Sequence, residues 1–396
     1  MKFNKWTVAL AAVGVVSLAS AARADEKMSA MQTALSDTTI SGYVSASANW
    51  ELVPTAGVSS SSPAGFIPFQ GITKQDGFNL DVVKLSISKP QDESPWASGY
   101  QADLIFGPDA VAYNTSANSG STADFAIKQA YIALRTPVGN GIDWKIGVFD
   151  TIIGYEVFDA GSNPNYTRSY GYAIEPTEHT GILGTYKIND ELSVSAGVAN
   201  TLSAGINARA ATSGFGNGSG SDWHKTLMAS TTFTAPSSWG WMSGSSFYAG
   251  VVYGINMANA GAGLTDYQAN WYLGATMNTP LKQLTTGFAL DYVSHFAGTG
   301  VDVWSIGTYA TYKANDKLSF SGRAEYIEGD IYNLAGTGGR PTPSAYELTA
   351  TVEYDMWANV VSRVELRWDD ITDNKGSVGI AHGDSLGLYA NVIYKF

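Results

Sequence analysis

Apolar and polar residues alternate along nearly the whole chain, from Thr39 to the C-terminus. The clearest case is residues 385–396, whose apolar face carries Leu386, Leu388, Ala390, Val392, Tyr394 and Phe396. Mostly small or polar residues lie between them, and successive side chains of a strand point to opposite faces. The pattern predicts an amphipathic strand with a terminal aromatic residue, which is typical of bacterial outer-membrane barrels. A half-buried edge strand of a soluble protein would alternate in the same way.

The same period of two recurs along the rest of the chain, which predicts an all-β protein. It is clear in Thr39–Trp50, Ala97–Phe106, Gly141–Phe149, Glu191–Ala199, Phe247–Tyr253, Ala269–Met277, Lys282–Tyr292, Val301–Tyr312, Lys317–Ile327, Tyr346–Tyr354 and Asn359–Trp368. It is weaker in Asn79–Lys89, Phe125–Arg135, Thr180–Ile188 and Thr226–Phe233. With the C-terminal strand there are about sixteen, an even number that suits a transmembrane, antiparallel, up-and-down β-barrel.

Short and long connections alternate between these segments. Links such as Asn189-Asp190 and Asn315-Asp316 are tight, whereas the long links are rich in Gly, Ser and Asn. The long links are Leu52–Gly77, Pro108–Thr122, Thr151–Pro176, Thr201–Trp223, Asn256–Tyr267, Glu328–Ala345 and Asp369–Gly383. Outer-membrane barrels have short periplasmic turns and long external loops. A soluble sandwich has no reason to keep this asymmetry, so it favours the barrel.

The N-terminus predicts export. Lys2 and Lys5 precede an apolar run, and Ala22-Arg23-Ala24 fits a cleavage site, so residues 1–24 are expected to be a signal peptide. Residues 25–38 form a polar periplasmic lead-in and residues 39–396 the barrel. Loss of the leader, with its three basic residues, changes the net charge from −12 to −15, which argues against nucleic acid as a partner. No cysteine is present, so disulfides and thiolate metal sites are excluded.

Aromatic residues lie near both ends of the predicted strands, on the apolar face. Trp304 and Tyr312 are eight residues apart, roughly 21 Å along the membrane normal at ~3.4 Å rise and ~40° tilt. This spacing fits an apolar band about 25 Å tall with an aromatic girdle at each interface. The expected membrane-interface residues are Trp50, Trp271, Trp304, Trp368, Tyr312, Tyr354, Tyr394 and Phe396.

Charged residues gather on the opposite face of the strands. They include Lys84, Asp103, Lys145, Lys187, Asp291, Arg323, Glu325, Glu347, Glu353, Arg363, Glu365 and Arg367. An Arg or Lys facing lipid at the midplane would cost about 2–4 kcal/mol, whereas one facing a water-filled channel costs little. Around sixteen strands, the bore is wide enough for an aqueous pore. A lumen plugged by loops, with these charges as structural ion pairs, is the alternative.

The third long connection is more apolar and aromatic than the rest, as expected for a segment that packs inside the barrel. We expect it to fold inward, although an external lid over the mouth is an alternative. Its Glu156, Asp159 and Glu175, with Arg168, are expected at a pore constriction. They would face basic wall residues and create a transverse field. The basic wall residues are Lys84, Lys145, Arg323, Arg363 and Arg367.

Four short motifs between residues 128 and 183 carry a family resemblance. They are Ala130–Gly141 (AYIALRTPVGNG), Gly147–Thr151 (GVFDT), Asn163-Pro164-Asn165 with Arg168-Ser169, and His179-Thr180-Gly181. This part of the chain resembles the OmpL-like family of putative outer-membrane porins (putative β-barrel porin 2). Thr167 stands where Ser is expected, and Glu178 where a neutral residue is commoner. The resemblance implies a pore-forming protein and leaves the solute open.

The predicted function is that of an outer-membrane porin, a passive diffusion channel for ions and small hydrophilic solutes, with no enzyme activity and no cofactor or metal. The acidic balance suggests a mild preference for cations. A solute-specific channel, with Tyr155, Phe158 and Tyr166 as stacking surfaces for sugars, is the first alternative. A rim-sited hydrolase and a surface adhesin are less favoured. Expected partners are outer-membrane lipids and, through the C-terminal strand, the barrel-assembly machinery. A homotrimer would match general porins of this size, but the sequence does not show the oligomeric state.

Overall fold

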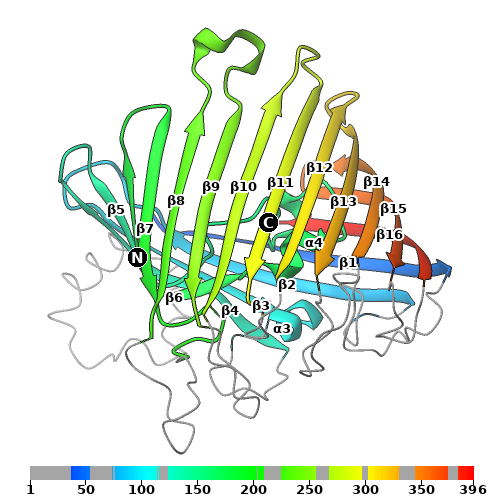
Figure 1. Ribbon diagram of the computed structural model, residues 1–396, viewed down its shortest axis with the longest axis horizontal. Helices are drawn as coiled ribbons and strands as arrows, with labels where there is room; N and C mark the ends of the chain where they lie inside the picture. Colours follow the sequence, from blue (N-terminus) through cyan, green and yellow to red (C-terminus); the bar gives the residue numbers. More distant parts are fainter. Residues whose placement is uncertain are drawn as a thin grey trace, which may run out of the picture.

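The computed structural model describes residues 37–53, 74, 76–113, 115, 124–202, 204–208, 224–255, 267–296, 302–329, 344–372 and 382–396. Sixteen antiparallel strands form one closed barrel, in which consecutive strands pair and β16 pairs with β1 (Figure 1). The predicted all-β barrel of about sixteen strands is therefore confirmed. The strands are β1 (Thr39–Val53), β2 (Gly77–Lys89), β3 (Ser98–Phe106), β4 (Phe125–Thr136), β5 (Ile142–Asp150), β6 (Glu178–Lys187), β7 (Leu192–Ala199), β8 (Thr226–Thr234), β9 (Ser246–Gly254), β10 (Gln268–Asn278), β11 (Leu284–Ser294), β12 (Val303–Lys313), β13 (Leu318–Gly329), β14 (Ser344–Trp357), β15 (Val360–Thr372) and β16 (His382–Lys395).

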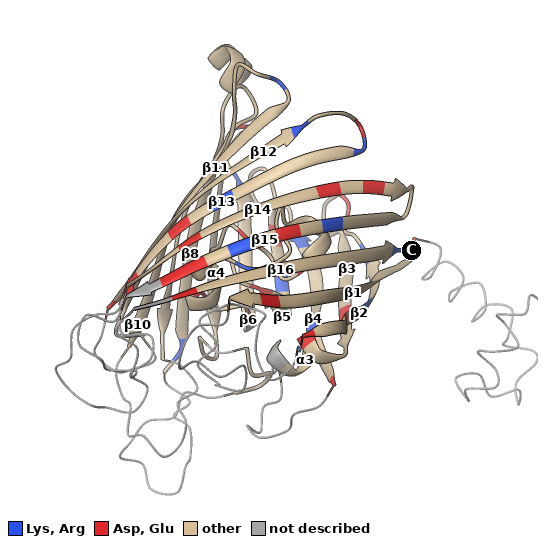
Figure 2. Ribbon diagram, turned by 90° about the vertical axis from the view of Figure 1, so that its right-hand side faces the viewer, with Lys and Arg blue, Asp and Glu red and all other residues tan. Residues whose placement is uncertain are grey.

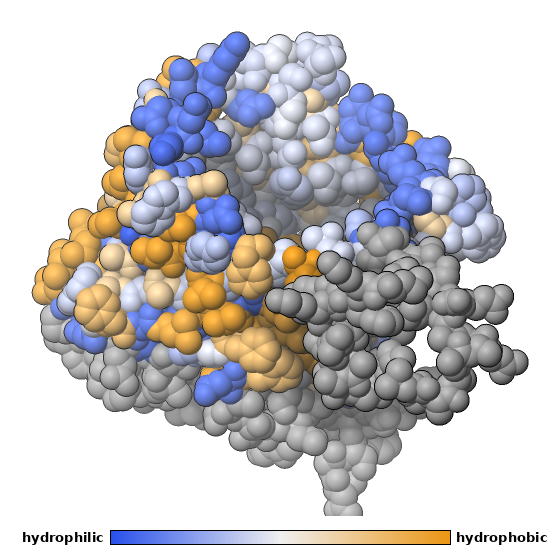
Figure 3. All heavy atoms as spheres, turned by 180° about the vertical axis from the view of Figure 1, so that it is seen from behind, coloured by the Kyte–Doolittle hydropathy of each residue, from blue (hydrophilic) through white to orange (hydrophobic). Residues whose placement is uncertain are grey.

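The alternation along each strand separates two surfaces. In β15, Arg363, Glu365 and Arg367 are buried, whereas Val364 and Leu366 between them are exposed. Because the barrel is closed, the buried face of this strand is the inner one and the exposed apolar face is the outer one. Figure 2 shows the acidic and basic positions along β14 and β15. Figure 3 shows apolar residues on the outside of the molecule and a hollow with more polar residues inside.

Phe396 extends the pairing of β16 with β1 at the seam of the barrel. The backbone N–H of Gly42 in β1 donates to the carbonyl of Phe396 at 2.9 Å, and the N–H of Phe396 donates to the carbonyl of Gly42 at 3.0 Å. A Cβ atom on Gly42 would lie 2.7 Å from the Phe396 ring. Only glycine therefore lets the Phe396 ring lie this close to β1 at the seam.

The connections contain short helices that the strand periodicity does not predict. They are α3 (Pro108–Tyr113) after β3, the 3-10 helices η1 (Ala160–Ser162) and η2 (Ser237–Met242), and α4 (Tyr170–Ile174) after β5. Ser169 explains where α4 begins, because its hydroxyl accepts a hydrogen bond from the N–H of Tyr172 at 3.0 Å. No helix in the described part of the chain is long and apolar enough to span a membrane. Residues 1–36 lie outside the described residues, so the signal peptide and most of the lead-in stay predictions.

One irregularity in the β3–β4 pairing turns a lysine inward. Asp103 pairs with Gln129 but the next residue, Leu104, pairs with Ile127, so Lys128 is the extra residue of a β-bulge. A strict alternation from Gln129 would point Lys128 toward lipid, where its charge would be costly. In the structure Lys128 is buried, and its Nζ lies 2.6 Å from Asp150.

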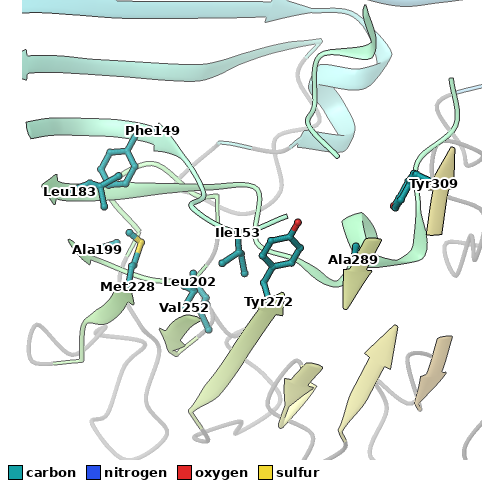
Figure 4. Close-up of a cluster of buried hydrophobic side chains, with 10 residues drawn as sticks. All are labelled: Phe149, Ile153, Leu183, Ala199, Leu202, Met228, Val252, Tyr272, Ala289 and Tyr309. Carbon is teal, nitrogen blue, oxygen red and sulfur yellow. The ribbon is translucent and has the colours of Figure 1, made fainter. Parts of the chain in front are cut away.

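A cluster of buried apolar side chains lines the inner wall from β5 to β12. Ile153, from the connection after β5, lies close to Tyr272 of β10 in this cluster (Figure 4). Glycines on the inner face make room for this connection. A Cβ atom on Gly250 would lie 2.6 Å from Ile153, and one on Gly287 would clash with the Tyr155 hydroxyl. The connection therefore lies directly on the backbone of β9 and β11.

The eight aromatic residues predicted at the membrane interfaces are all half-buried or exposed. At one end of the barrel, rings follow one another across three strands, with Trp304–Tyr326 and Tyr326–Tyr346 centroids 5.1 and 4.8 Å apart. At the opposite end, Tyr312 pairs with Phe320 across β12 and β13. Two separate groups of outer aromatics are the arrangement expected of interfacial girdles, and their contact with the membrane stays a prediction.

Candidate functional site: the lumen and its third connection

Residues 151–177, here called the third connection, join β5 to β6 and lie against the inner faces of distant strands. Arg363 of β15 donates from Nη2 to the carbonyl of Ala160 at 2.6 Å and from Nη1 to that of Asn165 at 3.1 Å. Glu365 of the same strand accepts from the backbone N–H of Thr167 at 2.9 Å. Side chains of the wall thus supply hydrogen-bond partners to the backbone N–H and C=O groups of the connection, which buried backbone groups need.

Arg323 of β13 joins the third connection to two wall strands. Its Nη1 lies 2.7 Å from the Glu156 carboxylate and donates to the carbonyl of Thr167 at 2.8 Å. Its Nε donates to Glu347 of β14 at 3.0 Å. Arg323, Glu156 and Glu347 have no exposed side-chain surface. Charges buried this completely are stable only when they are paired and hydrogen-bonded, so the network fixes the position of Glu156.

Arg367 of β15 binds the next part of the connection in the same way. Its Nη1 donates to the carbonyl of Arg168 at 2.6 Å, and its Nη2 lies 2.7 Å from Asp369. The Tyr170 hydroxyl at the start of α4 donates to the same carboxylate at 2.6 Å. Arg168 itself donates to the carbonyl of Phe158. Arg168 is therefore buried within the connection and stabilises its turn.

On the other side of β16, Lys84 and Asp159 form a second contact. Lys84 Nζ of β2 lies 2.9 Å from the Asp159 carboxylate and 3.2 Å from Asp103 of β3. The Tyr43 hydroxyl of β1 also donates to Asp159, at 3.0 Å. The third connection is thus bonded to both β13–β15 and β1–β2, which lie on either side of the β16 seam.

A further ion pair lies close to Asp159, and the sequence interpretation did not include it. Lys128 pairs with Asp150, the last residue of β5, and Asp150 interacts electrostatically with Asp159 and Lys84. Lys145 lies nearby with its Nζ 4.9 Å from the centre of the Tyr131 ring. The β-bulge is what brings Lys128 here, and the strand alternation alone could not reveal it.

Glu175, at the end of the connection, lies beside an acid rather than a base. Its carboxyl group is hydrogen-bonded to that of Asp291 in β11. Burial raises the pKa of Glu175 well above its ordinary value, and the nearby Asp291 raises it further. A protonated Glu175 can share its proton with the Asp291 carboxylate. Of the expected acid–base contacts, the structure brings together Glu156 with Arg323 and Asp159 with Lys84.

The aromatic residues proposed as sugar-stacking surfaces differ in accessibility. Phe158 and Tyr166 are buried, the first in a cluster with Tyr113 of α3. Tyr155 is half-buried and its ring stacks on that of Tyr309 in β12, with centroids 4.0 Å apart. Of the three, Tyr155 is the one with substantial exposed surface.

Comparison with known proteins agrees with this architecture. A profile of the family described as "Putative beta-barrel porin-2, OmpL-like" matches residues 37–396. The chain belongs to this family. Membership places the OmpL-like protein among the β-barrel porins of the bacterial outer membrane, which confirms the resemblance drawn from residues 128–183. No curated protein matches the OmpL-like chain in sequence.

Several solved structures share the fold at low sequence identity. The outer membrane channel DcaP of Acinetobacter baumannii is 14% identical, with a TM-score of 0.56 over 91% of this chain and 97% of that chain. An anion-selective porin from Comamonas acidovorans is 12% identical, with a TM-score of 0.56 over 91% and 99%. The trimer form of OmpT from Vibrio cholerae is 13% identical, with a TM-score of 0.54 over 91% and 99%. At such identities the likeness concerns the fold alone.

Proposed function

We propose that this OmpL-like porin is a passive diffusion channel for ions and small hydrophilic solutes, narrowed by the third connection. The observation that carries the proposal is the position of that connection. Buried wall charges bond to it from Lys84 in β2 to Arg323 in β13, and Ile153 and Tyr155 of the connection lie on the inner faces of β9 and β11. A segment held by so many polar bonds to the inner wall reduces the cross-section of the bore.

The uncharged part of the wall supports an aqueous path beside this segment. The inner faces of β7 and β8 carry Ser193, Ser195, Ser230 and Thr232, which are partly exposed. Tyr248 of β9 pairs with Thr232 and is also exposed. Hydroxyl groups bind water and carry no net charge, so this part of the lumen suits hydrated solutes.

Planar-bilayer recording of the refolded protein tests the proposal. We expect discrete, ohmic conductance steps in potassium chloride. A variant in which residues 157–168 are replaced by a short Gly-Ser linker should conduct more per step, because the segment that narrows the lumen is shortened. A wild-type protein that inserts without conductance, or a linker variant with unchanged step size, would contradict the proposal.

A solute-specific channel is the second candidate. It is supported by the stacked Tyr155–Tyr309 pair and by the exposed Tyr248, because aromatic faces and hydroxyl groups together suit neutral, hydroxylated solutes such as sugars. Block of the current by maltodextrins, absent in Tyr155→Ala, would favour this candidate over a general pore.

A hydrolase site has less support. His179 is fully buried, and its Nε2 lies 3.1 Å from the Thr151 hydroxyl, so it is not placed to act on a solute at the rim. We propose that the protein is not an enzyme and that it assembles as a homotrimer, the second proposal resting on the trimeric form of the similar OmpT barrel. Crosslinking in outer membranes tests the trimer.

A further inference from the structure

The charges of the lumen differ in how far water reaches them. The side chains of Arg323, Arg363 and Arg367 have no exposed surface. Carbonyl groups of the third connection occupy several of their donors. These arginines lie behind the connection, and a permeating ion in the water-filled part of the bore does not contact them.

Two ion pairs beside the connection are oriented with the acid toward water. In the pair Lys128–Asp150, the lysine side chain is 2% exposed and the aspartate 40%. In the pair Lys84–Asp159, the lysine is 11% exposed and the aspartate 25%. Asp103, the second partner of Lys84, is 2% exposed and adds negative charge on the buried side. Each pair is therefore a dipole whose negative end faces the water.

The same orientation recurs elsewhere on the wall. In the pair Arg363–Glu353 the arginine side chain is fully buried and the glutamate is 30% exposed. In Arg135–Asp143 the corresponding values are 16% and 42%. Among the described ion pairs of the inner wall, each carboxylate that is at least a quarter exposed is paired with a less exposed base.

Exposed lysines would counteract the negative charge of these carboxylates, so their positions along the barrel matter. Lys187 and Lys313 lie at strand ends next to the short turns, and Lys395 lies at the end of β16. Lys145 is the base close to the two acid-outward pairs. It is half-buried, interacts with Asp150, and lies over the Tyr131 ring. Beside the third connection, two carboxylates thus face water against one lysine.

We propose that Asp150 and Asp159 make the channel prefer cations, and that Lys145 weakens this preference. The inference rests on the proposed function and deepens it, because it assigns the permeant class and the residues that select it. An ion that passes the third connection meets the carboxylate end of each pair first, and the closer charge dominates the interaction. The effect acts on passing ions and needs no binding site.

Reversal potentials in a potassium chloride gradient test the proposal on the full-length, refolded channel. Wild type should be cation-selective. Asp150→Asn and Asp159→Asn should each lower the ratio of cation to anion permeability by about twofold, the effect expected of one unit charge about 8 Å from the ion path when ~0.1 M salt screens it. Lys145→Gln should shift the ratio in the opposite direction. Asp316→Asn, in the exposed turn between β12 and β13, is the matched control and should leave it unchanged.

The outcomes separate the two proposals. A wild-type protein that does not conduct overturns the proposed function. A conducting wild type with no cation preference, or aspartate variants that conduct without a shift, overturns the selectivity inference alone. Asp150→Asn leaves Lys128 without its carboxylate partner, so that variant carries a risk of misfolding. Folding of Asp159→Asn and Lys145→Gln is checked by heat-modifiable mobility in gel electrophoresis. If both fold, opposite shifts of their permeability ratios support the selectivity inference, and shifts in the same direction overturn it.

Discussion

The inner walls of β13–β15 and of β7–β9 follow the same alternation but carry different chemistry. The first wall places Arg323, Glu347 and Arg363 inward, all of them buried under the third connection. The second places Ser195, Ser230 and further small or hydroxyl-bearing side chains inward, and these remain partly exposed. The first wall therefore holds a segment of the chain by charged groups. The second wall contacts that segment through Gly250 and buried apolar side chains such as Met228, and its hydroxyl-bearing part leaves room for water.

The difference teaches that a charged inner face is not by itself a pore lining. Many of the charged residues on the predicted inner face are buried and hold the structure together. In a fully plugged lumen, all of them would be buried in this way. The uncharged wall, which carries little signal in the sequence, has more water-accessible surface. Electrostatic selectivity then depends on the few inner charges that keep contact with water.

The largest effect on stability is expected from removing Arg323 from the charged wall of β13–β15. Arg323→Ala leaves Glu156 and Glu347 buried without their common cation, so we expect a loss of about 3–5 kcal/mol in unfolding free energy. Urea unfolding followed by tryptophan fluorescence measures it. Ser195→Ala on the opposite wall is the matched control, with an expected change within about 0.5 kcal/mol. Equal stability of the two variants would contradict the assigned difference between the walls.

An intermediate effect is expected from releasing the third connection at its two acidic contacts. The double variant Glu156→Ala, Asp159→Ala removes the contact of the connection with Arg323 of β13 and its contact with Lys84 of β2. We expect altered single-channel conductance and increased current noise, because the segment is held less firmly. A variant that matches wild type in step size and ion preference would show that these contacts do not shape the pore.

The smallest effect is expected from the carboxyl pair at the end of the connection. The pKa of Glu175 is raised by burial and by Asp291, so the folded protein keeps a proton that the unfolded chain releases at lower pH. Stability should therefore fall as pH rises above the ordinary Glu pKa, up to the raised one. Glu175→Gln, which stays neutral, should flatten this dependence in unfolding measured between pH 4 and 8. An unchanged slope would exclude Glu175 as its source.

Much of the architecture was predictable because lipid and water enforce the period of two. Alternate residues such as Val364 and Arg363 could be assigned to opposite faces from their chemistry alone, and the strand number and the lengths of the connections followed. The pairing of Glu156 with Arg323 and of Asp159 with Lys84 agrees with charge complementarity between the connection and the wall. These features depend on local pattern or on simple electrostatics.

The remaining features depend on positions in space that no local pattern encodes. Lys128 faces inward because of a bulge, and Glu175 lies beside Asp291 because α4 ends against β11. Burial of Phe158 depends on its packing with Tyr113 of α3, a helix whose six residues give no strand signal. How far water reaches each charge is likewise a property of the folded barrel.

The seam between Gly42 and Phe396 has a consequence for biogenesis. Until β16 has been exported, β1 has no partner along this edge, and its free backbone groups can pair with another chain. A truncated translation product would carry this open edge permanently. We therefore expect stop codons placed before β16 to produce aggregates in the periplasm rather than narrower channels.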